Sequence, residues 1–247
     1  MRAGYDARKG QGHDRPTPPP LREAVTGISA PDLLALLPRM ERLMVIGRGP
    51  GVTHERIGPV EAVTASDTGL RLSGACHDAV IDPARIAGIV PDTHSLMGGK
   101  VYPRLEFLDA TGGLLFSIVG MEGLDAFSAP FADRPRHPVP PRAADAPPGE
   151  AQDLDPGDPA HDPFQTAQEQ GAMARIGFDN GTLRQGWSGR IEAPRPSRGF
   201  LNVMTADFHL HLKGGGLSGW RSEPGRRVAL DAEGRPNGLV VASEGLA

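Results

Sequence analysis

The sequence predicts an α+β protein made of two related halves, each a curved antiparallel sheet with a few packed helices, with the second half reduced. Three observations predict this fold class. Short apolar runs alternate with turn residues along the chain, which is typical of antiparallel strands. A proline-rich stretch separates residues 21–132 from residues 164–247. The two segments also share short sequence matches in the same order, which indicates an internal repeat.

The repeat rests mainly on two matched pairs. Gly58–Ala62 reads GPVEA and recurs as Gly189–Ala193, which reads GRIEA. Leu108–Gly112 reads LDATG and recurs as Leu230–Gly234, which reads LDAEG. Two β-rich halves with a glycine-containing hairpin turn at the same place in each would produce this pattern.

The first segment is expected to open with a helix. Residues 1–20 are polar and proline-rich, so we expect a disordered tail there. Ser29 is a helix N-cap candidate, because a proline and an aspartate follow in the first turn and a leucine-rich run comes next. Pro38 is expected to end or kink this helix, since proline removes a backbone donor.

Strands are expected after this helix. Residues 43–46 form one short apolar run. Residues 101–108 alternate, with Leu105 and Phe107 on one face, and Pro103 predicts that this strand lies at a sheet edge or carries a bulge. Residues 114–119 are its expected hairpin partner.

The proline-rich stretch and the second segment follow. Nine prolines fall between residues 133 and 163, a composition that predicts an exposed, protease-sensitive linker without a packed core. Short strands are expected over residues 200–204, 208–212 and 227–230 of the second segment. The glycines of residues 214–216 separate the second of these from the third.

Composition excludes several classes of protein. The net charge is −4 and no lysine or arginine run occurs, so the chain is a poor candidate for binding nucleic acid. No apolar stretch is long enough to span a membrane, and the N-terminus lacks the apolar core of a secretory signal. A single cysteine, Cys76, excludes an intrachain disulfide framework. We therefore expect a cytoplasmic protein without membrane insertion.

A glycine-rich loop raises a nucleotide-binding alternative. Residues 43–51 read LMVIGRGPG, which resembles a strand that leads into a dinucleotide loop. That motif needs a helix directly after the glycines, to bring the helix N-terminus to the pyrophosphate. The residues that follow are β-branched and stop at a Gly-Pro pair, so we expect a plain turn between two strands.

The histidines are the other candidates for chemistry. His209 and His211 are two residues apart on an expected strand, so their side chains share one face, where they could bind a metal. The sequence shows no third ligand nearby, so a solvated or cleft-lining polar face stays the alternative. No Ser-His-Asp set, paired carboxylates or Gly-x-Ser-x-Gly motif supports a hydrolase.

Three stretches resemble the HemS/ChuX-type heme-utilisation proteins, also called hemin-degrading factors. Residues 33–61 are similar to the opening of the family's first repeat, where a helix and a strand precede a His-Glu pair. Residues 104–127 resemble the hairpin that closes that repeat. Residues 198–220 resemble the second repeat's signature, Leu-Asn-Val followed by Asp-Phe-Asn-Leu-His-Leu-Arg. The chain resembles a shortened or divergent tandem-repeat member, because a proline-rich linker replaces most of the helical portion of the second repeat.

The resemblance implies a set of heme contacts. Heme needs an axial ligand, usually a neutral histidine, and cations for its two propionates. The candidate iron ligands are His54, His94 and His161. The other candidate contacts are Arg85, His209 and Lys213. Arg85 lies near a family position with an arginine that faces the heme, and Lys213 replaces the arginine of the signature.

Between His54 and His161, the residues favour His54 as the iron ligand. His54 follows an expected strand, whereas a ligand in a proline-flanked linker would lose conformational entropy on binding. The family precedent favours His161 instead, because the family's ligand lies near the start of the second half, in an Asp-x-His-x-Phe setting.

The resemblance implies a cytoplasmic heme-binding protein for the use of heme iron. It would deliver heme to a heme oxygenase or take part in heme degradation with an external electron donor. Two alternatives stay open at this point. The chain could be a non-enzymatic heme carrier or sensor, or a degenerate scaffold that no longer binds heme.

Overall fold

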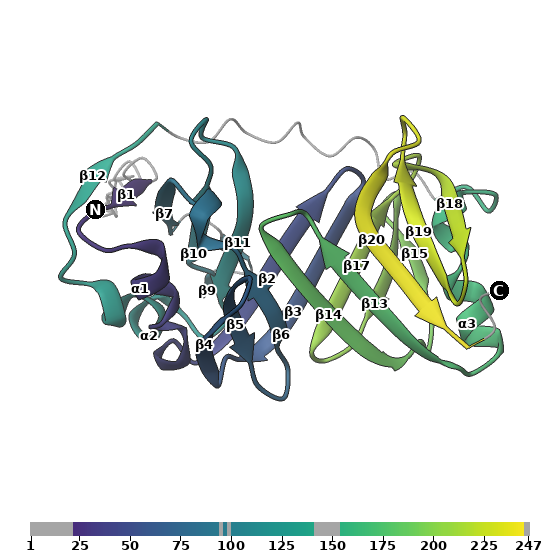
Figure 1. Cartoon of the computed structure of the whole chain (residues 1–247), viewed down its shortest axis with the longest axis horizontal. Coiled ribbons are helices and arrows are strands. Elements are labelled where there is room, and N and C mark those ends of the chain that lie inside the picture. The colour runs from purple at the N-terminus through teal and green to yellow at the C-terminus, as the bar shows by residue number, and fades with distance from the viewer. Residues whose placement is uncertain (1–21, 94–95, 98–99, 141–153, 245–247) are drawn as a thin grey trace, which may run out of the picture.

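Two antiparallel sheets dominate the structure, a computed structural model that describes residues 22–93, 96–97, 100–140 and 154–244 (Figure 1). Each sheet has eight strands, and the described residues form three short α-helices. The predicted α+β class is therefore confirmed. The expected disordered tail, residues 1–20, lies outside the described residues.

Sheet 1 combines five strands of the first half with three of the second. Its strands are β2 (Arg42–Gly49), β3 (Val52–Pro59), β7 (Gly88–Asp92), β10 (Arg104–Leu108), β11 (Leu114–Gly120), β15 (Arg195–Ser197), β16 (Phe200–Met204) and β17 (Phe208–Lys213). Their order across the sheet is β15-β16-β17-β3-β2-β11-β10-β7.

Sheet 2 combines three strands of the first half with five of the second. Its strands are β4 (Ala62–Ser66), β5 (Gly69–Ser73), β6 (Asp78–Ile81), β13 (Met173–Asp179), β14 (Leu183–Arg190), β18 (Leu217–Glu223), β19 (Arg226–Asp231) and β20 (Pro236–Ser243). Their order is β18-β19-β20-β13-β14-β6-β5-β4.

The remaining elements are small. Two-stranded ribbons are formed by β1 (Glu23–Val25) with β12 (Arg136–Pro138), and by β8 (Leu96–Met97) with β9 (Lys100–Val101). The α-helices are α1 (Ala30–Leu34), α2 (Leu124–Ser128) and α3 (Phe164–Glu169). Single 3₁₀ turns occur at Leu37–Arg39, Pro83–Arg85, Ala129–Phe131 and Pro159–His161.

The two halves are joined by strand pairing. In sheet 1, β3 of the first half pairs with β17 of the second, and in sheet 2, β6 pairs with β14. The strands of the two halves correspond in chain order, with β2–β7, β10 and β11 equivalent to β13–β18, β19 and β20. If each strand is exchanged for its equivalent, the strand order of sheet 1 becomes that of sheet 2. The halves therefore have the same topology, and each contributes strands to both sheets.

The sequence matches fall at equivalent places in this topology. The first pair ends β3 and β14, and the second pair forms the β10–β11 and β19–β20 turns. In these turns, Asp109 accepts backbone hydrogen bonds from residues two and four positions later, and Asp231 does the same. The repeated Leu-Asp-Ala motif thus has a physical cause, since an aspartate stabilises a turn through its own carboxylate.

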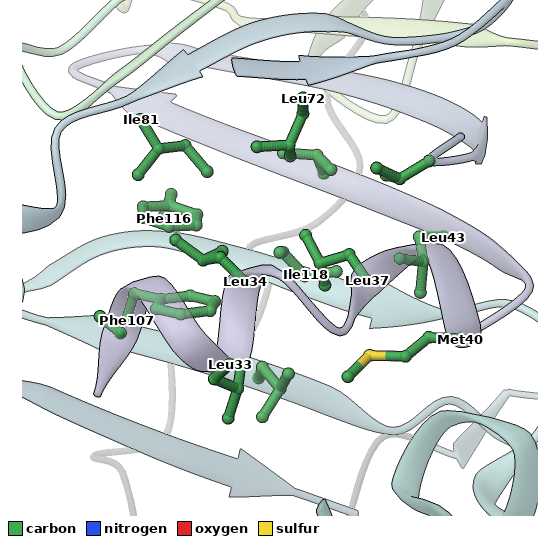
Figure 2. Packing of buried hydrophobic residues seen from close by; sticks show 14 of the residues in the cluster. Leu33, Leu34, Leu37, Met40, Leu43, Leu72, Ile81, Phe107, Phe116 and Ile118 are labelled. Atoms are coloured by element: carbon green, nitrogen blue, oxygen red, sulfur yellow. The ribbon is translucent and has the colours of Figure 1, made fainter. Parts of the chain in front are cut away.

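Each half has its own hydrophobic core, and each core includes a residue of the other half. The first core packs Leu34 and Leu37 among Phe107, Phe116 and other side chains from both sheets (Figure 2). Leu183 of β14 belongs to this first core, while Val52 of β3 belongs to the second. Side chains of this size contribute roughly 1.5–3 kcal/mol each when fully buried, so this exchange ties the halves together.

Several local predictions can be compared with the structure. Ser29 is the N-cap of α1, and its side chain accepts a hydrogen bond from the backbone N–H of Asp32. The glycine-rich loop at residues 47–51 belongs to the β2–β3 hairpin, so the plain turn is confirmed over the nucleotide loop.

The sequence predicts that the strand with Pro103 lies at an edge or carries a bulge. It is not at an edge, because β10 lies between β11 and β7, but its register with β11 shifts between Phe107 and Leu108, as a bulge requires. Pro103 directly precedes β10, where its carbonyl oxygen accepts a hydrogen bond from the backbone N–H of Gly120 on β11.

Both ends of the linker predicted over residues 133–163 are folded against the rest of the protein. On its N-terminal side, β12 pairs with β1. On its C-terminal side, Leu154 and Ala160 are buried, and Asp158 accepts a hydrogen bond from the backbone N–H of Gly215. Residues 141–153 lie outside the described part of the chain. Proline suits these flanks because isolated turns and short edge ribbons do not need its missing N–H.

Candidate functional site

Two histidines lie together on the outer face of sheet 1. On β17, Phe208, Leu210 and Leu212 are fully or nearly fully buried and point into the core. His209 and His211 alternate with them and are only partly buried. This arrangement follows from the two-residue period of a strand and agrees with the shared face that the sequence predicted.

The structure brings a carboxylate to these histidines. Glu55 on β3 is directly opposite His209 in the strand register, so both side chains lie on the same face. Its Oε2 atom is 3.4 Å from Nδ1 of His209 and 3.7 Å from Nε2 of His211. The third ligand that the sequence did not reveal thus comes from the neighbouring strand, which belongs to the other half. We call these three residues the His-Glu-His cluster.

The cluster keeps Glu55 ionised. Burial alone would raise the pKa of this carboxyl. Hydrogen bonds from His209 and His211, together with their charge, outweigh the burial and lower the pKa of Glu55 to about 2. A carboxylate with a full negative charge therefore lies between two imidazoles over a wide range of pH.

Neighbouring side chains orient the cluster and surround it. Nδ1 of His211 is 2.6 Å from Oδ1 of Asn202, on the adjacent strand β16. The register places Lys213 opposite Phe200, and Met204 opposite His209, on this same face. Phe200 and Met204 are 37% and 55% exposed, although they are large and apolar. The cluster and these neighbours therefore offer imidazoles, a carboxylate, an ammonium group and apolar surface.

His54, the preferred iron ligand, lies on the opposite side of β3 and is fully buried. Its Nδ1 is 3.0 Å from the side-chain nitrogen of Gln185, and its Nε2 is 3.4 Å from the carbonyl oxygen of Ile176. The ring packs against Phe178 and Phe208. Burial lowers the pKa of His54 to about 4. Both nitrogens already have partners inside the core, which argues against coordination of an iron atom by His54.

His161, the alternative iron ligand, lies near the surface in the 3₁₀ turn that precedes α3. Asp158 caps this turn by accepting a hydrogen bond from the backbone N–H of Ala160. The indole N–H of Trp220 donates to the carbonyl oxygen of Pro159 at 2.7 Å. Nε2 of His161 is 3.2 Å from the carbonyl oxygen of Asp155. These hydrogen bonds fix both the turn and the His161 side chain.

The other predicted contacts do not gather around one histidine. Arg85 is exposed and packs against Gly181, in the turn between β13 and β14. Lys213 lies at the end of β17, on the face of the His-Glu-His cluster. His94 lies outside the described residues.

A cavity of about 520 Å³ lies between the halves, and sequence patterns gave no sign of it. Its lining includes Arg56, His77, Arg175 and Trp187. Arg56 is buried and pairs with Asp207 at 3.2 Å, but its Nε and Nη1 atoms have no hydrogen-bond partner among the described residues. Unpaired guanidinium donors make this cavity chemically suited to a carboxylate or phosphate group. Arg56 directly follows Glu55 on β3, so strand alternation places the two side chains on opposite faces of sheet 1. The cavity and the His-Glu-His cluster therefore lie on opposite faces of this sheet.

Comparison with solved structures identifies proteins with the same fold. PhuS, a heme-binding protein from Pseudomonas aeruginosa, has a TM-score of 0.66 and 17% identity over 90% of this chain and 81% of PhuS. ChuS, a heme degrading enzyme of Escherichia coli O157:H7, has a TM-score of 0.70 and 14% identity over 90% of this chain and 81% of ChuS. The resemblance to heme-utilisation proteins that the sequence motifs predict is therefore confirmed at the level of the fold.

Comparisons by sequence find no relatives. No protein-family model matches the chain, and no curated protein matches it. No helix in the described part of the chain has the length and apolar character needed to cross a bilayer.

Proposed function

We propose that this chain, which has the fold of PhuS and ChuS, is a divergent HemS/ChuX-type protein that binds heme in the cytoplasm for the use of heme iron. The observation that carries the proposal is the likeness of fold over 90% of the chain to a heme-binding protein and to a heme-degrading enzyme. The sequence motifs in residues 33–61, 104–127 and 198–220 support it independently of the fold.

His161 is the iron ligand that we propose. A ligand in a loose linker would lose conformational entropy on coordination. Residues 154–163 are folded, and the turn is held by hydrogen bonds that Asp158 accepts from Gly215 and Pro159 accepts from Trp220, so His161 avoids most of this entropy loss. A partly exposed imidazole needs only to exchange its contact with the Asp155 carbonyl for a bond to iron. His54, in contrast, would have to leave the core.

Lys213 is a candidate partner for a heme propionate. It directly precedes the glycine turn at residues 214–216, and Asp158 bonds to Gly215 of that turn. Lys213 is exposed, so an ammonium group could move to a carboxylate without breaking a packed contact. These side chains are of the types that bind heme: a histidine for the iron, a cation for a propionate, and the aromatic rings of Phe164 and Trp220.

A hemin titration tests this proposal. The full chain without a histidine tag is titrated with hemin, and we expect a Soret band that saturates at one heme per chain. His161→Ala should shift the Soret maximum of the ferric complex, whereas His137→Ala, at an exposed histidine on β12, should not. Heme binding is refuted if no saturable Soret band forms, which would leave the scaffold alternative. A shift in His54→Ala alone would refute the assignment to His161.

A second experiment separates carriage from breakdown. If the protein takes part in breakdown, heme is the substrate and the protein supplies the ligand and the pocket, while an external donor supplies electrons. Reductant and oxygen are added to the heme complex in the presence of catalase, because free peroxide bleaches heme without any protein. Loss of the Soret band supports breakdown, and a stable band supports a carrier or sensor.

A further inference from the structure

The His-Glu-His cluster lies on the opposite face of sheet 1 from His54 and the second hydrophobic core. Its three side chains project from two hydrogen-bonded strands, so the ladder between β3 and β17 fixes their relative positions. One ligand atom from each of Glu55, His209 and His211 lies within 4.8 Å of the other two. Such a cluster on paired strands is a rigid platform for a small ligand.

These separations are close to those of a coordinated metal ion. Zinc bonds to histidine nitrogen and carboxylate oxygen are about 2.0–2.2 Å long, so ligand atoms in a tetrahedral site are about 3.4 Å apart. The Glu55 oxygen is already 3.4 Å from one imidazole nitrogen and 3.7 Å from the other. Small side-chain rotations would close the cluster around an ion without moving the backbone.

The hydrogen bonds around His211 select the form of the ring that binds a metal. A ligating histidine usually donates its other ring N–H to a nearby acceptor, which fixes the tautomer. Nδ1 of His211 donates to Oδ1 of Asn202 at 2.6 Å, so an ion that displaces the Nε2 proton facing Glu55 would meet an Nε2 lone pair directed at the cluster. The side-chain N–H groups of Asn202 donate to the carbonyl oxygens of Arg195 and Phe200, so its oxygen is held toward His211. This tautomer is inferred from the hydrogen-bond network.

Charge and access also suit a divalent ion. The carboxylate of Glu55 is 12% exposed, and the two imidazole side chains are 22% and 27% exposed. An ion could therefore enter from solvent and keep open positions for water. Two imidazoles with one carboxylate favour first-row transition ions over calcium or magnesium, which prefer oxygen ligands.

We propose that Glu55, His209 and His211 form a binding site for a first-row divalent transition ion such as Zn²⁺ or Fe²⁺, separate from the proposed heme ligand His161. The site uses a glutamate of the first half and two histidines of the second, and Asn202 positions His211. With three protein ligands, it leaves coordination positions free, as in metal sites that bind a further small ligand.

Cobalt and zinc titrations test this site. The full chain without a histidine tag is freed of metal with EDTA and titrated with Co²⁺, which reports on its ligands by visible absorption, and with Zn²⁺ by calorimetry. We expect one ion per chain. His209→Gln and His211→Gln should each weaken binding by more than about 100-fold, and Asn202→Ala by roughly 10–100-fold, the range for a residue that orients a ligand. His137→Ala is the matched control and should bind like the parent.

Each outcome decides the proposal. The absence of a Co²⁺ absorption band and of Zn²⁺ binding in the parent would overturn it, whatever the variants do. Parent-like binding in both histidine variants, or equal loss in His137→Ala, would also overturn it. If one variant fails to fold by circular dichroism, the other histidine variant and Glu55→Gln still decide. No heme is present in these titrations, so their failure is separate from a failure of heme binding.

Discussion

Replacing His54 should flatten the pH dependence of stability in the acid range. A histidine in an unfolded chain has a pKa of about 6.5. In the folded chain, burial lowers the pKa of His54 to about 4, the nearby Arg56 charge adds to this effect, and the hydrogen bond to Ile176 opposes it. Between about pH 6.5 and 4, the His54 imidazole is therefore protonated in the unfolded chain but neutral in the folded chain. The contribution of His54 to stability is complete above pH 6.5 and is lost as the pH falls toward 4.

The pKa values set the size of this effect. One pH unit between the folded and unfolded pKa corresponds to about 1.4 kcal/mol. Between pH 7.5 and 4.5, the single imidazole should thus remove roughly 2–3 kcal/mol of the free energy of unfolding. The pKa of Glu55 is lowered to about 2, so it adds its own loss below about pH 4.5, outside this range. His77 also has a pKa lowered by burial, so some slope should remain without His54.

The assay is urea unfolding at a series of pH values for the parent, His54→Leu and His137→Ala. The parent and His137→Ala should show the same fall in stability between pH 7.5 and 4.5, because His137 is exposed. His54→Leu can start from a lower stability, since it loses the contacts to Gln185 and Ile176, but its curve should fall less. Parallel curves for the parent and His54→Leu would refute the assignment of a buried, neutral imidazole.

Other substitutions test the packing by urea unfolding. Gly47→Ala should cost roughly 1–3 kcal/mol, because its Cβ would lie 2.6 Å from the Phe178 ring. Gly177→Ala, on β13 of sheet 2, meets nothing within 4 Å and should cost much less. Leu183→Ala should cost roughly 2–5 kcal/mol, as this second-half residue is fully buried in the first core; a cost below 1 kcal/mol would contradict the exchange of core residues. Ser29→Ala should cost about 0.5–2 kcal/mol by removing the cap of α1, and an unchanged midpoint would show that the cap is dispensable.

The features that the sequence predicted correctly depend on close neighbours in the chain. The Ser29 cap, the turn at Asp109 and the shared face of His209 and His211 are all decided within a few residues. Strand alternation and side-chain capping act over that distance, so the residues themselves contain the information. The motifs of the repeat were informative for the same reason, because they form the same turns in both halves.

The features that the sequence missed depend on pairing between distant strands. Nothing near His209 indicates that Glu55 lies opposite it, since the register between β3 and β17 is set by the whole sheet. The side of β3 that His54 occupies was equally hidden, because Val52–Ile57 mixes apolar and polar residues without a clear period. The fold of residues 154–163 was masked by their prolines, although Trp220 and Gly215 bind that segment from elsewhere in the chain.

The proposed metal site and the cavity beside Arg56 both lie where the two halves meet. The His-Glu-His cluster takes Glu55 from β3 and its histidines from β17, and the cavity lined by Arg56 and Trp187 also draws on both halves. Strands at this junction lie in the middle of the sheets, so a change there disturbs pairing on both sides.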